Sequence, residues 1–108
     1  MDGPHHSGNE VSVHGWWEEE GGVNCDKISK ATVHTELQVF KDGDWHTVGS
    51  ATKDVYAGGG RGKRATARHK CVGNRTMAYR GRAEADFHGV LDTPLWVTGN
   101  PVNRNCGA

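Results

Sequence analysis

The sequence predicts an all-β fold, a small antiparallel β-sandwich of immunoglobulin-like character, with an extended N-terminal arm. A chain of 108 residues has the size of one domain. Its 16 glycines and few leucines disfavour long helices and suit short strands joined by turns. Four or five alternating segments, spaced about ten residues apart, are typical of a sandwich, although an open barrel stays an alternative.

The domain is expected to span residues 10–108, because residues 1–9 hold glycine, proline and polar side chains with nothing apolar to anchor them. We therefore expect residues 1–9 to form a flexible arm. A first short strand follows from Glu10 to Trp17, where Val11, Val13 and Trp17 have the spacing of one buried face.

The clearest alternation runs from residue 29 to residue 41. One face carries Ala31, Val33, Thr35, Leu37 and Val39, and the other carries His34, Glu36 and Gln38. The Asp42-Gly43 pair that follows indicates a hairpin, because glycine accepts a positive φ. Residues 45–55 are expected to return antiparallel beside the first strand.

A glycine-rich basic loop is expected at residues 57–62, and alternating segments follow it. Strands are predicted over residues 64–71 and 76–88, with a turn at residues 72–75 between them. In the tail, Leu95, Trp96 and Val97 are expected to form an apolar clasp. The four tryptophans, Trp16, Trp17, Trp45 and Trp96, are expected to supply the bulk of the core.

Cysteine usage and hydropathy bear on the environment of the chain. Cys25, Cys71 and Cys106 show no CxxC or zinc-type spacing, so export would give one disulfide and one remaining cysteine. The sequence alone does not decide which two of the three cysteines form the disulfide. A cytoplasmic location is the alternative, and all three cysteines would then be reduced. No stretch is apolar enough to span a bilayer, and the N-terminus lacks the pattern of a signal peptide.

Charge is balanced in total but separated along the chain. Residues 1–26 carry six acidic and no basic side chains, whereas residues 53–80 carry eight basic side chains and one acidic one. These two regions can attract each other within the fold or face separate partners. The basic stretch predicts a site for an anionic ligand or nucleic acid, formed by Arg61, Lys63, Arg64, Arg68 and Lys70. A charged edge strand is the alternative reading.

No catalytic, metal or cofactor site is predicted. The seven histidines are scattered, without HExxH or a tight ligand cluster. His69 and Cys71 point the same way on one predicted strand, so an imidazole–thiolate pair is conceivable, but a structural disulfide also explains Cys71. A ribonuclease-like set built on Glu36 or Glu84 has no defining spacing.

Three runs carry a family resemblance: ATVHTELQVFKDGDWHTVGSATK, GGGRGKRATARHKC and MAYRGRAEADFHG. Together they resemble small cysteine-containing secreted β-domains of actinobacteria, over residues 25–88. The resemblance implies export and a disulfide at Cys71, with Cys25 as its partner, and it implies no activity.

The expected function is therefore a non-enzymatic, secreted protein-interaction module, such as an adaptor subunit of a larger extracellular assembly. One alternative is a binder of anionic ligands or nucleic acid through residues 61–70. The other alternative is a small secreted hydrolase or toxin. The partner and the oligomeric state do not follow from the sequence.

Overall fold

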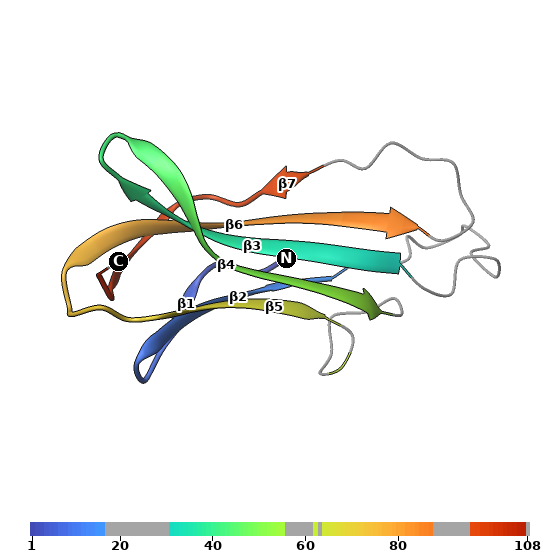
Figure 1. Ribbon diagram of the computed structural model, residues 1–108, viewed down its shortest axis with the longest axis horizontal. Coiled ribbons are helices and arrows are strands. Elements are labelled where there is room, and N and C mark those ends of the chain that lie inside the picture. The colour runs from blue at the N-terminus through green and yellow to red at the C-terminus, as the bar shows by residue number, and fades with distance from the viewer. Residues whose placement is uncertain (17–30, 56–61, 63, 88–95, 108) are drawn as a thin grey trace.

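A computed structural model describes residues 1–16, 31–55, 62, 64–87 and 96–107 as two antiparallel β-sheets, without a helix in these ranges (Figure 1). The smaller sheet has the order β1 (His5–Ser7), β2 (Glu10–Gly15) and β5 (Ala65–Lys70). The larger sheet has the order β4 (Asp44–Val55), β3 (Ala31–Lys41), β6 (Thr76–Phe87) and β7 (Val97–Thr98), and β8 (Val102–Asn105) also pairs with β6. The predicted all-β sandwich is confirmed, and its immunoglobulin-like character stays a prediction.

The core lies between the two sheets and centres on β3. Every second residue of β3 from Ala31 to Val39 is buried, as the alternation predicted, and packs with small aliphatic side chains of β2 and β5. The buried members of the core include Val11, Val13, Ala31, Val33, Leu37, Val39, Val55, Ala65, Ala67, Tyr79 and Cys106.

The prediction that tryptophans supply the core bulk is wrong for the described ones. Trp16 and Trp45 are partly exposed, and Trp96 is 39% exposed. Trp17 lies outside the described residues. Small inward residues let the sheets approach closely, so valine, leucine and one tyrosine fill the space that tryptophan would overfill.

The β3–β4 hairpin forms as predicted, through a tight turn. Asp42 and Gly43 have φ angles of 55° and 78°, the pair of positive values that a type I′ turn requires. The register shifts between Leu37, which pairs with Gly49, and Gln38, which pairs with Thr47. Val48 is therefore the extra residue of a β-bulge and packs against the core.

The N-terminal segment, expected to be a flexible arm, instead contributes β1 to the smaller sheet, and Pro4 is buried. The Asp2 carboxylate accepts a hydrogen bond from the His14 backbone N–H at 2.7 Å. Partial burial raises the pKa of Asp2, but hydrogen bonds from His14 and His5 outweigh burial and lower the pKa overall. An ionised carboxylate thus fastens this segment to β2.

The C-terminal tail also forms strands that the sequence did not predict. β7 and β8 both run along β6, and β8 carries the chain to Cys106. Within the predicted apolar clasp, Trp96 and Val97 are exposed, and Leu95 lies outside the described residues.

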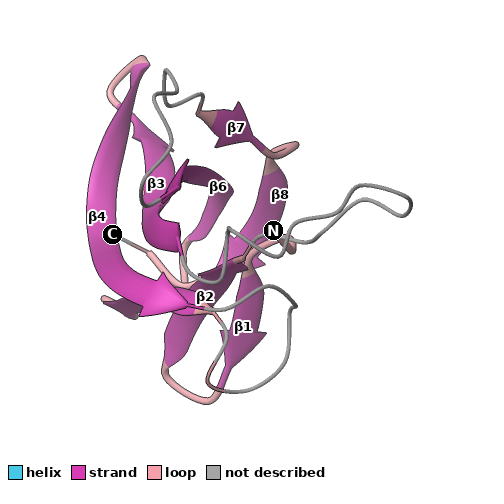
Figure 2. Ribbon diagram, turned by 90° about the vertical axis from the view of Figure 1, so that its right-hand side faces the viewer, coloured by secondary structure: helices cyan, strands magenta, loops and turns pink. Residues whose placement is uncertain are grey.

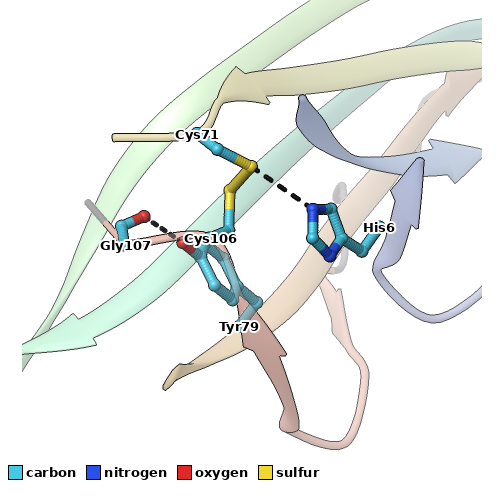
Figure 3. The surroundings of a disulfide bond; sticks show 5 residues. All are labelled: His6, Cys71, Tyr79, Cys106 and Gly107. Atoms are coloured by element: carbon cyan, nitrogen blue, oxygen red, sulfur yellow. Dashed lines mark hydrogen bonds between the residues drawn. A yellow bond between two sulfur atoms is a disulfide. The ribbon is translucent and has the colours of Figure 1, made fainter. Parts of the chain in front are cut away.

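The predicted Cys25–Cys71 pairing is wrong. Cys71 bonds to Cys106, with a Cα–Cα distance of 4.6 Å, because β8 returns beside the start of β6 and brings Cys106 next to the end of β5 (Figure 3). Cys25 lies outside the described residues.

Gly49 is required where β4 crosses β5, because an added Cβ would overlap the backbone carbonyl of Arg68. Gly49→Ala should therefore lower the free energy of unfolding by about 1–3 kcal/mol, as overpacking does. Gly3→Ala is the matched control, since nothing lies within 4 Å of its added Cβ. Urea denaturation measures both variants, and equal stability of the two would contradict the close approach of β4 and β5.

The disulfide closes a loop of sequence separation 35. Replacing both Cys71 and Cys106 with alanine should cost about 3–4 kcal/mol of unfolding free energy, because the unfolded chain regains loop entropy. Cys25→Ser keeps the bridge and serves as control. A loss in Cys25→Ser as large as the loss in the double variant would contradict the Cys71–Cys106 bridge, because it would show that Cys25 takes part in the disulfide.

Candidate binding face

The larger sheet presents one face away from the smaller sheet, here called the outer face. Residues paired directly across neighbouring strands point to the same side, so the register assigns its members. β4 forms one margin of this face, and β7 and β8 form the other (Figure 2). Its described members include Thr32, His34, Glu36, Gln38, Phe40, Trp45, Thr47, Ser50, Thr52, Asp54, Thr76, Ala78, Arg80, Arg82, Glu84, Asp86, Trp96, Thr98, Asn103 and Asn105.

A cation–π pair, Arg80 and Trp45, lies toward the hairpin end of the outer face. The Arg80 guanidinium lies 4.2 Å from the ring centroid of Trp45. Arg80 Nε donates to Gln38 Oε1 at 2.8 Å, and Gln38 Nε2 donates to Thr47 Oγ1 at 3.1 Å. Phe40 meets Trp45 edge-on, with ring centroids 5.3 Å apart. These contacts fix the positions of all five side chains.

A second stacked pair lies near the opposite margin. The Arg82 guanidinium is 4.7 Å from the ring centroid of Trp96. Arg82 Nη1 lies 3.4 Å from Glu36 Oε1, a charge-assisted contact across β3 and β6. Pairing of Thr98 with Arg82 brings Trp96 to this place. The unpredicted β7 therefore completes the outer face.

The end of the outer face near the start of β3 is more acidic. His34 Nε2 lies 3.7 Å from Glu84 Oε1, and His34 Nδ1 lies 2.8 Å from Thr52 Oγ1. Asp54 and Asp86 lie one step further along the same face. Arg80 and Arg82 therefore lie toward the hairpin end of the outer face, and Asp54, Glu84 and Asp86 lie at the other end.

A cavity of about 380 Å³ lies at the hairpin end. β3 pairs with β6 only as far as Val39 and Tyr79, and beyond this point the hairpin tip turns away from β6 (Figure 1). We call the space between them the fork cavity. Its volume falls within the range of ligand pockets. It is lined by Phe40, Lys41, Asp42, Val72, Arg75, Thr76, Met77, Ala78 and Gly107.

The disulfide shapes one wall of the fork cavity. Val72 N donates to the Cys106 carbonyl at 2.9 Å, and Gly107 N donates to the Arg75 carbonyl at 2.9 Å. The buried Tyr79 hydroxyl donates to the Gly107 carbonyl (Figure 3). Burial raises the pKa of Tyr79 above its ordinary value of 10.0. The bridge and Tyr79 thus hold the residues that border the cavity.

The fork cavity is lined by two exposed cations, Lys41 and Arg75, and one exposed anion, Asp42, so its lining carries a net positive charge beside the apolar side chains of Phe40 and Met77. Within the described residues, neither cation takes part in a salt bridge. Their charge is therefore open to a partner. The chemistry suits an apolar side chain flanked by carboxylates.

The predicted basic site at residues 61–70 does not assemble into one free surface in the described part. Arg68 Nη1 contacts Glu10 Oε1 at 2.6 Å, and Lys70 pairs with Glu10 in the register of β2 and β5. Arg64 is half-buried. Arg61 and Lys63 lie outside the described residues, so their part of the hypothesis stays a prediction. At Arg68, basic and acidic segments attract each other within the fold.

The conceivable pair of His69 and Cys71 is not formed. Cys71 is held in the disulfide, and the imidazole beside it belongs to His6, whose Nε2 lies 3.6 Å from Cys71 Sγ (Figure 3). His69 Nε2 is buried and has no hydrogen-bond partner among the described residues. A thiolate–imidazole mechanism therefore has no support here.

Comparisons with known proteins found no matching family model, no matching curated protein and no matching solved structure. No helix in the described ranges is long and apolar enough to cross a membrane. The Cys71–Cys106 pair is compatible with an extracellular location.

Tyr79→Phe removes the buried donor to the Gly107 carbonyl and should cost about 1–3 kcal/mol of unfolding free energy at pH 7. The raised pKa means that the folded state keeps Tyr79 neutral at a pH where the unfolded state ionises it. The stability that Tyr79 contributes is therefore full below pH 10 and falls as pH rises through the folded-state pKa. Phenylalanine cannot ionise, so the Tyr79→Phe variant lacks this pH-dependent contribution to stability.

Urea denaturation of wild type and Tyr79→Phe at pH 7 and above pH 10 measures this difference. The wild-type advantage should shrink at the higher pH. An advantage that stays constant or grows would contradict the assignment of a buried neutral tyrosine.

Proposed function

We propose that the protein is an exported, non-enzymatic interaction module that docks a protein partner on the outer face and in the fork cavity. One observation carries this proposal: Phe40 both lines the cavity and contacts Trp45, so an anchoring pocket continues into an ordered aromatic and arginine surface. Tryptophan and arginine beside a pocket are typical of the residues that dominate binding energy at protein interfaces.

Preorganisation supports this assignment. Arg80 is held by Gln38 and Trp45, and Arg82 by Glu36 and Trp96. Side chains that are already ordered lose less rotamer entropy when a partner binds. The outer face is therefore suited to rigid docking.

Charge indicates the chemistry of the partner. Lys41 and Arg75 at the fork cavity would attract carboxylates, and the apolar lining would accept a hydrophobic side chain. The partner segment is thus acidic, with an aliphatic or aromatic anchor.

Carbohydrate is less well suited to the same surface. A guanidinium already covers one ring face of Trp45 and one of Trp96. The side-chain amide of Gln38 is engaged at both its oxygen and its nitrogen, so it has less capacity for sugar hydroxyls. Export is supported by the disulfide, since such bridges persist mainly in oxidising compartments.

The test is selection of a displayed library of random peptides against the immobilised, disulfide-bonded protein. Selected peptides should combine Asp or Glu with an apolar residue. Their affinity should fall about tenfold or more in the Lys41→Glu/Arg75→Glu variant, which is at least 1.4 kcal/mol. Phe40→Ala should weaken the same peptides.

Lys70→Glu is the control, because it reverses an exposed charge on the smaller sheet. Peptides that bind the Lys41→Glu/Arg75→Glu variant as tightly as wild type would contradict the proposed site. A parallel glycan array provides the other decisive outcome: glycan binding lost in the same variants would assign the outer face to carbohydrate instead.

A further inference from the structure

Asp2, His5 and His14 meet on the side of the smaller sheet that faces away from the core. His5 lies on β1 and pairs with Ser12 of β2, which places His14 diagonally across from it on the same side. Asp2 precedes β1 and reaches the same point. The β1–β2 hairpin thus brings His14 next to Asp2 and His5, so that three potential ligands converge.

The distances among these side chains are short. Asp2 Oδ2 lies 2.9 Å from His5 Nε2 and 2.7 Å from His14 Nδ1. One ligand atom from each residue lies within 4.8 Å of the other two. The carboxylate therefore stands between two imidazole nitrogens, each aimed at the same oxygen.

The backbone holds this arrangement in place. Asp2 N donates to the His14 carbonyl at 3.2 Å, and His14 N donates to Asp2 Oδ1 at 2.7 Å. Buried Pro4 then fixes the chain before His5. His5 is 55% exposed at its side chain, whereas His14 is 16% exposed, so one side of the cluster is open to solvent and to an entering ion.

We propose that Asp2, His5 and His14 bind a divalent transition-metal ion of the zinc type. Two imidazoles and one carboxylate suit Zn²⁺ and its first-row neighbours, whereas Mg²⁺ and Ca²⁺ prefer oxygen ligands alone. Bonds of about 2.0–2.2 Å in tetrahedral geometry separate ligand atoms by about 3.3 Å. Binding thus needs the Asp2–His distances to open by about half an ångström, with water in the fourth position.

The other described histidines do not share this site. His6, on the opposite side of β1, approaches the disulfide, and His69 pairs with Val11 on the core side of β5. His34 and His46 belong to the larger sheet. The metal site lies on the smaller sheet, so it is independent of the proposed docking on the outer face. Its effect would be to tie the N-terminal segment and β1 to β2.

The experiment is isothermal titration of ZnCl₂ into the protein at pH 7.4, in a Cys25→Ser background that removes a competing soft ligand. We expect one ion per chain. His5→Ala should weaken binding at least tenfold, and Asp2→Asn should also weaken it. His46→Ala, which changes an exposed histidine of β4, should leave the affinity within twofold. MgCl₂ should give no binding.

Histidine side-chain NMR supplies a second readout that does not depend on any variant folding. Zn²⁺ should shift the ring resonances of His5 and His14 and leave those of His34 and His46 unchanged. Absence of Zn²⁺ binding at millimolar concentration would overturn the proposal. Equal losses in His5→Ala and His46→Ala would overturn it too, because they would show diffuse binding to surface histidines.

Discussion

The two-residue alternation along β3 is the constraint on which the rest of the structure depends. β3 pairs with β4 on one side and β6 on the other, and its inward side chains are buried against the smaller sheet. The sheets approach so closely that a Cβ on Gly15 would overlap the Thr35 hydroxyl. A shift of one residue would exchange core and solvent faces, so the core and the outer face are fixed together.

The fork cavity follows from where this pairing stops. Past Val39, the tight turn and the bulge at Val48 carry the hairpin away from β6. The start of β6 pairs with β8, and the disulfide closes that end. A hollow bordered by charged turn residues therefore opens next to the ordered outer face. The turn, the β-bulge and the disulfide thus form the candidate site, and no sequence motif marks it.

Local patterns were enough to predict most of the fold. The alternation of residues 31–41, the Asp42-Gly43 turn and the outward set of Arg80, Arg82 and Glu84 all follow from nearest-neighbour rules. Contacts between distant segments did not follow. β7 and β8 are too short to show a pattern, and the Cys71–Cys106 bridge depends on where β8 returns.

The sequence also did not predict that Asp2, His5 and His14 converge. Strand pairing in the β1–β2 hairpin brings them together, and their spacing in the sequence matches no metal-site motif. For the tryptophans, the sequence predicted burial that the structure does not show for the described ones. Their size predicted burial, but Trp45 and Trp96 stack on arginines at the surface. Placing them required the register of β6 with its neighbours.

The most direct test of the central claim is a map of backbone amide NMR shifts during titration with a selected acidic peptide. We expect the largest changes on the β3–β4 hairpin, at the start of β6 and around Arg80. Changes concentrated on β2 and β5 would place the binding surface on the smaller sheet and contradict the claim that β3 organises the docking face.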